Sequence, residues 1–366
     1  MRCVVVPPVP VPYREPLFAL LAQRGRIGLE VVYMSGTQLG WDQRPDWFPA
    51  LHAYRSRMLA ARQRARPGRT PVLLPRGLGA ALTELDPDCV VSWEYGPATL
   101  RALAWCGRRG RPLMIFSELT PAAERALSPL QRRVHRLLAP RAAGFVTASS
   151  AARERLVRMG VPEELIEVSL QSADVEAFRA AAERRPVHAG PPRILCVGRL
   201  VPDKNQSLLI RAFAAAGAPG ELLLCGTGPL EGSLREEAAR LGAPVRFLGY
   251  VPPAELPELY ARADGLALVS SYEPFGVAAR EAAAAGLPII CSTAAGAAGD
   301  VAVEGENALL VEPEDEPGLT RALGRLLSDP ALREGLAAGS RAVTERTPLE
   351  RDAEAFERAV LRAAGR

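Results

Sequence analysis

Residues 193–210, RILCVGRLVPDKNQSLLI, decide the fold, because they join a short apolar run to an amphipathic stretch through a turn. A continuous apolar run that ends in such a turn and continues as a helix is typical of a parallel strand buried on both faces. The turn also holds Lys204, the one lysine among the 45 Lys and Arg residues of the chain. This stretch therefore predicts a strand–turn–helix unit with a distinctive cation at its turn.

The same alternation of apolar strands and helical stretches runs through the whole chain. Strands are predicted in the first half at 2–8, 29–34, 88–93, 112–118, 144–149 and 166–172. Strands are predicted in the second half at 193–198, 221–225, 245–249, 265–270, 288–292 and 308–312, before a helical end at 319–364. Strands that alternate with helices pair in parallel, so the predicted fold class is α/β, with two Rossmann-like, doubly wound domains in series.

The boundary between the two domains is expected within residues 180–192, which are charged, carry prolines and lack an apolar period. The expected domains are 1–185 and 193–345, and the helix at 346–366 is expected to pack back on the first domain. Ligands of such sheets bind at the carboxyl ends of the strands. A cleft between the two domains is therefore the expected place for a ligand site.

Composition indicates a globular chain with reduced thiols. Of the 366 residues, 48% are hydrophobic and 23% are charged, which is enough apolar content for each half to bury a core. Prolines interrupt the N-terminal apolar run, and no stretch reaches the ~20 apolar residues of a membrane helix, so a cytosolic location is expected. The six cysteines form no CxxC pair, which favours buried thiols over disulfides or a zinc site.

The two halves differ in charge. Residues 1–192 hold 27 arginines and 17 acidic residues, a balance of +10, while the remainder holds 18 basic and 24 acidic residues, a balance of −6. The basic segments 55–69 and 131–136 would suit phosphate, an acidic saccharide or an anionic membrane surface, and the alternative is a solvated helix face. Peripheral contact with an anionic membrane is therefore one expectation, whereas a nucleic-acid partner is not expected.

Arg199 and Lys204 follow a predicted strand directly, at the edge of the sheet where ligands bind. The next helix is predicted to begin near Asn205, so its free N–H groups would face the same place. A guanidinium, an ammonium and a helix amino terminus together form a cradle for a polyanion such as a diphosphate. The alternative is an ordinary solvated turn.

A second constellation, SSYEPFGVAAREAAAAGLPII, spans residues 270–290 and contains Glu273 and Glu281. Eight residues of continuous helix would separate these two glutamates by roughly 12 Å. The carboxylates of a glycoside hydrolase lie about 5 to 9.5 Å apart, so this pair does not suit that reaction. Two carboxylates that bind opposite ends of an elongated ligand fit better, with N–H groups at Gly276 and Val277 between them. The alternative is that both glutamates are ordinary surface residues.

The motif series at 193–210, 222–234 and 245–292 resembles the C-terminal domain of family 4 retaining nucleotide-sugar glycosyltransferases. These enzymes have the GT-B fold, two Rossmann-like domains that face each other across a cleft. The resemblance implies transfer of a sugar from a UDP- or GDP-sugar to a saccharide, lipid-linked or natural-product acceptor. It also implies that the anomeric configuration is kept and that neither a metal nor another cofactor is needed.

The resemblance implies three catalytic residues: Arg199, Lys204 and Glu273. Arg199 and Lys204 would bind the donor diphosphate and stabilise the leaving nucleotide in place of a metal, and Glu273 would hold hydroxyls of the donor sugar. Glu281 would bind the ribose. The remaining donor contacts would be made by Val251, whose backbone would meet the base, and by Phe275, Gly276 and Val277.

The first half departs from the family pattern. The loop after the first strand, PPVPVPYREP at 7–16, has no glycine, and MIFSELT at 114–120 stands where many members place a histidine. Ser117 or Glu118 would therefore have to contact the sugar. The candidates on the acceptor side are Tyr13, Arg14, Trp93, Glu94 and Glu118.

Two other functions fit parts of the sequence. The glycines of GTGPLEG, 226–232, suggest an NAD-dependent oxidoreductase, but the acidic residue that would bind the ribose is missing from FLGYV at 247–251. A nucleotide-sugar-binding protein without turnover is the other alternative. The acidic string Asp86-Pro87-Asp88 precedes its strand, on the edge of the sheet opposite the ligand edge, so no metal site is expected there.

Overall fold

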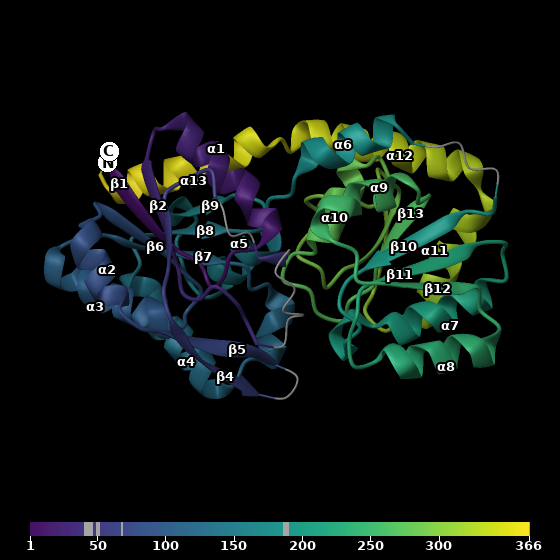
Figure 1. The fold of residues 1–366 in the computed structure, drawn as a ribbon, viewed down its shortest axis with the longest axis horizontal. Helices are drawn as coiled ribbons and strands as arrows, with labels where there is room; N and C mark the ends of the chain where they lie inside the picture. The colour runs from purple at the N-terminus through teal and green to yellow at the C-terminus, as the bar shows by residue number, and fades with distance from the viewer. Residues whose placement is uncertain (40–46, 49–51, 67–68, 186–189, 366) are drawn as a thin grey trace. The chain divides into compact units, whose positions relative to one another are not determined.

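The computed structural model describes residues 1–39, 47–48, 52–66, 69–185 and 190–365 (Figure 1). The chain divides into two compact units. The first unit is Met1–Ser172 together with Leu349–Arg366, and the second unit is Ala173–Pro348.

The first unit is built on a seven-stranded sheet in which all the strand pairs are parallel. Its strands, in spatial order, are β3 (Ser56–Met58), β2 (Gly28–Tyr33), β1 (Arg2–Val6), β6 (Cys89–Trp93), β7 (Leu113–Ser117), β8 (Gly144–Thr147) and β9 (Ile166–Val168). Its helices are α1 (Glu15–Arg24), α2 (Leu78–Leu85), α3 (Pro97–Arg109), α4 (Pro129–Leu138), α5 (Ser150–Arg158) and α13 (Leu349–Ala363). All residues of β6 and β7 are buried, as the continuous apolar runs predict for strands covered on both faces.

The basic segment 55–69 does not form a helix in the part of it that the structure describes. It forms β3 and then enters an antiparallel hairpin of β4 (Ala61–Arg66) and β5 (Arg69–Pro75). The exposed Arg62 and Arg64 alternate with the less exposed Ala61 and Gln63, which is the period of two of a strand. The helix-face alternative is therefore wrong for this segment, and the prediction of strands missed all three.

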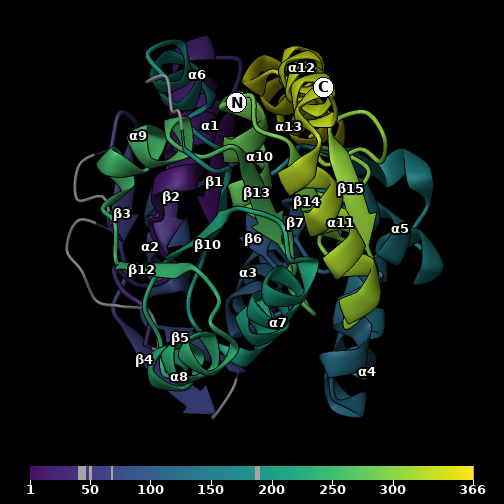
Figure 2. The ribbon, with the colours of Figure 1, turned by 90° about the vertical axis from the view of Figure 1, so that its right-hand side faces the viewer.

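The second unit contains a six-stranded, entirely parallel sheet. Its strands, in spatial order, are β12 (Val245–Gly249), β11 (Glu221–Cys225), β10 (Arg193–Val197), β13 (Gly265–Leu268), β14 (Ile289–Ser292) and β15 (Ala308–Val311). Its helices are α6 (Val175–Glu183), α7 (Gln206–Ala216), α8 (Glu231–Leu241), α9 (Leu256–Ala261), α10 (Val277–Ala284), α11 (Glu316–Ser328) and α12 (Pro330–Arg346). Helices α7, α8 and α11 share one apolar core with the sheet, while α6, α9 and α10 pack together on its other side (Figure 2).

The division between the units differs from the expected boundary at residue 185. Helix α6 packs on α9 and α10 of the second unit, and Phe178 meets the ring of Tyr260 edge-on with centroids 5.0 Å apart. Both side chains are buried, so the apolar face of α6 ties residues 173–185 to the second unit. The part of the expected boundary at 186–189 lies outside the described residues.

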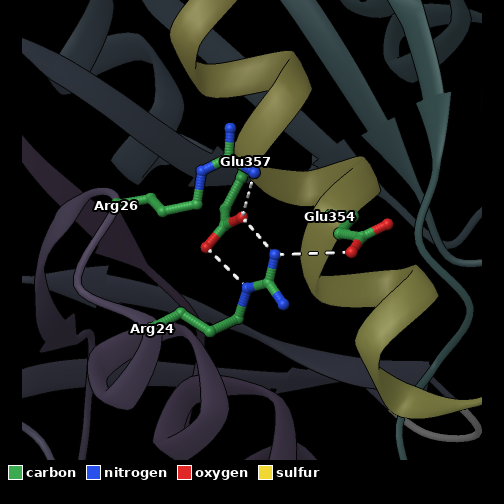
Figure 3. A network of polar contacts seen from close by, with 4 residues as sticks. All are labelled: Arg24, Arg26, Glu354 and Glu357. Atoms are coloured by element: carbon green, nitrogen blue, oxygen red, sulfur yellow. Dashed lines mark hydrogen bonds and ion pairs between the residues drawn. The ribbon is translucent and has the colours of Figure 1, made fainter.

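The last helix, α13, packs on α1, β8 and β9 of the first unit. Its fully buried Glu357 accepts hydrogen bonds from Arg24 Nε and Nη2, both at 3.1 Å, and from Arg26 Nη1 at 3.3 Å (Figure 3). Asp352 Oδ1 accepts a further bond from Leu170 N at 2.8 Å. Residues 346–348 belong to the second unit, so the returning segment begins three residues later than expected.

All six cysteines are free and buried, as their scatter along the sequence predicts. Within the described residues, no helix combines the length and apolar character needed to cross a membrane. In the same part of the chain, no three His, Cys, Asp or Glu side chains gather into a group that could hold a metal ion.

Candidate functional site

The turns after β10 and β13 meet in the second unit, because these two strands are neighbours in the parallel sheet. Lys204 Nζ forms an ion pair with Glu273 Oε2, and Ser270 Oγ donates to the same oxygen at 3.4 Å. Ser271 N donates to Asp203 O at 3.0 Å, which joins the two turns through their backbone. Two residues 69 positions apart in sequence therefore form one charged centre at the carboxyl edge of the sheet.

Arg199 lies on the same turn as Lys204, with its side chain exposed. Its carbonyl oxygen accepts a hydrogen bond at 2.9 Å from Nε2 of the buried Gln206. Lys204 ends a short 3-10 turn, and Asn205 then takes a left-handed conformation, φ +58°, before α7 begins. The turn that carries both cations is thus fixed by the first residues of α7.

Glu273 and Phe275 are supported by the segment that follows β14. Gly296 N donates to Glu273 O at 3.1 Å, and Ala297 N donates to Phe275 O at 2.8 Å. Gly276 has φ +95°, and a Cβ at this position would lie 2.5 Å from Leu268 Cδ2, so a larger residue would be strained there. Helix α10 begins only at Val277, and the estimate of roughly 12 Å along a continuous helix does not apply to Glu273.

Glu281 lies in a second polar group with Tyr260, Cys225 and Val251. The hydroxyl of the fully buried Tyr260 donates to Glu281 Oε2 at 2.6 Å. Burial raises the pKa of Glu281 to about 7, and the Tyr260 hydrogen bond opposes that rise. Burial also raises the pKa of the Cys225 thiol to about 12, while a hydrogen bond with the Val251 backbone lowers it and the Glu281 charge raises it. Val251, which is expected at the base, and Glu281, which is expected at the ribose, therefore both lie near Cys225.

The glycines of 226–232 have a packing role at the same edge. Gly226 N donates to Gly249 O at 2.7 Å, and a Cβ on Gly226 would lie 2.0 Å from Gly198 O. A Cβ on Gly228 would lie 2.3 Å from Leu200 O. Only glycine allows these backbones to approach so closely. Gly226 and Gly228 are therefore explained by the close approach of the chain segments at the carboxyl ends of β10, β11 and β12.

The acceptor-side candidates of the first unit gather at the carboxyl ends of β6 and β7. Arg14 Nη2 forms an ion pair with Glu118 Oε1 at 2.9 Å. The Arg14 guanidinium lies 4.5 Å above the centre of the Trp93 ring and 5.4 Å from that of Tyr13. Trp93 in turn stacks on Phe116, with centroids 3.8 Å apart. Four of the five candidates are thus in contact around one buried arginine.

The fifth candidate, Glu94, takes a left-handed conformation, φ +52°, immediately after β6. It accepts hydrogen bonds from Glu118 N at 2.5 Å and from Ser117 Oγ at 3.1 Å. Burial raises its pKa to about 7, although the bond from Glu118 N opposes that rise. Beside it, Arg14 Nε and Trp93 Nε1 are buried donors without a hydrogen-bond partner in the described structure. The group offers both donors and acceptors to a hydroxyl-rich ligand.

Sequence reasoning missed the residues that hold these groups in place. They are Gln206 and Tyr260 in the second unit. In the first unit, sequence reasoning also missed a network around Glu15, next to Arg14 in the sequence. Glu15 accepts hydrogen bonds at 2.7 Å from Tyr54 OH, through Oε1, and from His52 Nδ1, through Oε2. No short sequence motif points to any of these residues. The one indication in the sequence is that Glu15 directly follows Arg14, which was itself a candidate.

Two family models match the chain. The model described as "Glycosyl transferases group 1" matches residues 179–343, and the model "Glycosyltransferase Family 4" matches residues 25–176. The chain is 33% identical over 221 residues to glycogen synthase of Mycobacterium tuberculosis, which is 58% of this chain and 53% of that protein. It is 38% identical over 194 residues to D-inositol 3-phosphate glycosyltransferase of Corynebacterium urealyticum, 47% and 45% of the two chains. The chain spans about half the length of these curated relatives.

The crystal structure of Anabaena HepE in complex with UDP superposes with a TM-score of 0.78 at 20% identity, covering 97% of this chain and 98% of that chain. The two parallel-sheet units are therefore the Rossmann-like domains of the GT-B fold. One glycosyltransferase family model thus matches each half of the chain, and the two matched ranges, 25–176 and 179–343, fall one on each sheet.

Proposed function

We propose that this protein is a retaining hexosyltransferase that moves a sugar from a UDP- or GDP-sugar to a saccharide, lipid-linked or natural-product acceptor without a metal ion. The observation that carries the proposal is the ion pair of Lys204 and Glu273 at the carboxyl ends of β10 and β13. In this proposal the Lys204 ammonium would meet a phosphate and the Glu273 carboxylate a sugar hydroxyl, the two groups on either side of the bond that breaks.

The diphosphate would replace Glu273 as the partner of Lys204, with Arg199 on the same turn as a second cation. Both cations stabilise the charge that develops on the leaving nucleoside diphosphate, which is the role a metal ion has in other transferases. Glu273, released from the lysine, accepts hydrogen bonds from the hydroxyls of the donor sugar. Backbone N–H groups at Gly276 and Val277, where α10 begins, add further donors to the phosphate.

The nucleoside would bind at the group formed by Val251 and Glu281. The Glu281 carboxylate accepts from ribose hydroxyls, and the Val251 backbone meets the base. The UDP in the crystal structure of Anabaena HepE supports a uridine nucleotide.

The acceptor would bind in the first unit, at the group of Arg14, Trp93, Glu94 and Glu118. Buried Arg14 Nε and Trp93 Nε1 donate to acceptor oxygens, and the two carboxylates accept from acceptor hydroxyls. Tyr13 adds an aromatic ring beside Arg14. Such a mixed set of donors and acceptors suits a polyhydroxylated ring.

Thermal-shift measurements with UDP, GDP, TDP and ADP, and then with their sugars, test the donor site, because a bound ligand raises Tm. We expect a rise with UDP or GDP, then transfer in the presence of EDTA, with a product that keeps the donor's anomeric configuration by NMR. No rise with any nucleotide contradicts the donor site. Binding without transfer or donor hydrolysis indicates a non-catalytic binding protein, and loss of activity in EDTA that Mn²⁺ restores contradicts metal independence.

A further inference from the structure

Helix α4 carries an unusual outer surface. The helix begins at a capping box in which Gln131 N donates to Ser128 Oγ at 3.3 Å and Ser128 N donates to Gln131 Oε1 at 3.0 Å. Its inner side buries His135 and Leu138 against the first unit. Leu130 and Leu137, by contrast, are 71% and 52% exposed. Leu130 and Leu137 lie seven residues apart, and that spacing places them on one side of the helix.

The exposed arginines of α4 lie beside these leucines on the outer surface of the helix. Arg132, Arg133 and Arg136 are exposed, and Arg141 follows the helix. Arg132 donates to Leu127 O at 3.0 Å and Arg141 donates to Leu137 O. None of the four forms an ion pair with an acidic residue of the described chain, and α4 itself contains no acidic residue. The outer surface therefore combines uncompensated positive charge with apolar side chains.

The β4–β5 hairpin presents a similar surface. Arg62 and Arg64 are exposed on β4, and Arg64 pairs with Val72 of β5, which is 45% exposed. The hairpin and α4 lie at the same end of the first unit, the lower end in both ribbon views (Figures 1 and 2). One flat anionic surface can therefore approach both elements.

An anionic lipid bilayer accounts for both features of this surface. A soluble polyanion would pair with the arginines but would leave Leu130 and Leu137 in water. At a bilayer, the leucines enter the boundary between headgroups and acyl chains, while the arginines meet lipid phosphates. Each basic side chain near such a surface is favourable by its attraction to the negative surface potential.

We propose that the outer face of α4, centred on Leu130, Arg133, Arg136 and Leu137, docks the first unit onto an anionic membrane, with Arg62 and Arg64 of the hairpin as a second contact. The proposal concerns a surface of the first unit and does not depend on the donor site of the second unit. It makes the enzyme peripheral to the membrane through a helix that lies in the interface.

Co-sedimentation of the full chain with vesicles tests the proposal. The vesicles are phosphatidylcholine alone, or phosphatidylcholine mixed with phosphatidylglycerol. We expect binding to the mixed vesicles only, weakened by salt. Leu130→Ser with Leu137→Ser, and separately Arg133→Glu with Arg136→Glu, should each lower the partition coefficient by about tenfold or more. Unchanged Tm values would show that the variants fold.

Matched controls separate this surface from general effects of charge and hydrophobicity. Leu100→Ser replaces a leucine of α3 that is 48% exposed. Arg240→Glu with Arg246→Glu reverses two exposed arginines of the second unit. Both controls should bind within about twofold of the wild type.

Three results would overturn the proposal. The first is no binding to the mixed vesicles. The second is equal binding to both kinds of vesicle, which would remove the role of anionic lipid. The third is wild-type binding by the leucine variant when the arginine variant has lost binding, which would identify the surface as a site for a soluble polyanion.

Discussion

The carboxyl edges of the two sheets carry similar groups that are held in place in different ways. Each edge has a carboxylate–cation pair, Lys204 with Glu273 in the second unit and Arg14 with Glu118 in the first. Each also has a glutamate whose pKa burial raises to about 7, Glu281 and Glu94 respectively. The difference lies in what supports these groups.

In the second unit the support is mainly backbone. Ser271 N bonds to Asp203 O, Gly296 N bonds to Glu273 O, and glycines allow the turns to cross. In the first unit side chains carry more of the support, because Arg14 pairs with Glu118 and lies over Trp93. Only the Glu118 N–H bond to Glu94 comes from the backbone among the contacts of the group described above. A site held by backbone needs only a few glycines and turn residues in a fixed order, so short motifs reveal it. A site held by side chains depends on partners from many places in the chain.

The largest expected effect is on the chemistry at the second edge. Lys204→Ala and Arg199→Ala should each lower kcat by roughly 100-fold or more, because each removes charge stabilisation of the leaving group. Steady-state transfer or donor hydrolysis measures the effect. Arg246→Ala, which removes an exposed arginine of the same unit, is the matched control and should leave kcat unchanged. Near-wild-type rates for both site variants would contradict the role of Lys204 and Arg199 at the leaving group, and so the assignment of the chemistry to the second edge.

The next effect concerns the stability of the first unit. Glu357→Gln removes the buried charge that two arginines share, and should lower the free energy of unfolding by about 1–3 kcal/mol. Denaturant unfolding followed by circular dichroism measures the change. Glu354→Gln is the control, since Glu354 is 49% exposed and lies 3.5 Å from Arg24; it should cost less than about 0.5 kcal/mol. Equal losses of stability in the two variants would mean that the buried Glu357 carboxylate contributes no more than the exposed Glu354 to the packing of α13 on the first unit.

A smaller effect is expected at the acceptor group. Glu94→Gln should raise the acceptor KM by about tenfold, because one hydrogen bond to a charged acceptor is lost. The affinity for the nucleotide sugar, measured by calorimetry, should not change. A weaker nucleotide affinity, with an unaltered acceptor KM, would assign Glu94 to the donor and would contradict the separate roles of the two edges.

The smallest effect concerns pH. In the proposed function the Glu281 carboxylate accepts ribose hydroxyls, so affinity for a nucleotide sugar should fall as the pH drops through about 7. The Tyr260 hydrogen bond lowers the pKa of Glu281, so Tyr260→Phe should raise that pKa and move the midpoint to higher pH. At pH 7 we expect roughly two- to fivefold weaker binding. A nucleotide sugar is the suitable ligand, because its diphosphate keeps its charge in this range.

Two variants complete the pH experiment. Glu281→Gln should bind weakly with no dependence on pH near 7, since the titrating group is gone. Glu94→Gln should keep the wild-type profile, since Glu94 belongs to the first unit. A profile for Tyr260→Phe that coincides with the wild type would show that Glu281 does not control nucleotide binding.

The sequence predicted the α/β class, twelve of the thirteen strands in the two large sheets, and the turns that carry Arg199, Lys204 and Glu273. It did so because buried parallel strands are continuous apolar runs, and because the chain leaves each one at the ligand edge. The prediction was wrong where periodicity is masked by composition. The arginines of 55–69 hide a strand and half of a hairpin, since charged residues on an exposed face carry little apolar signal.

By itself, then, the sequence determined the order of twelve strands of the two large sheets and the turns that carry Arg199, Lys204 and Glu273, which are local properties of the chain. Only the tertiary structure decided that α6 belongs with the second unit and that Arg14, Trp93, Glu94 and Glu118 form one group. The physical reason is that parallel pairing brings strand ends together across long stretches of chain, and an amphipathic helix buries its apolar face against whichever surface the fold presents to it.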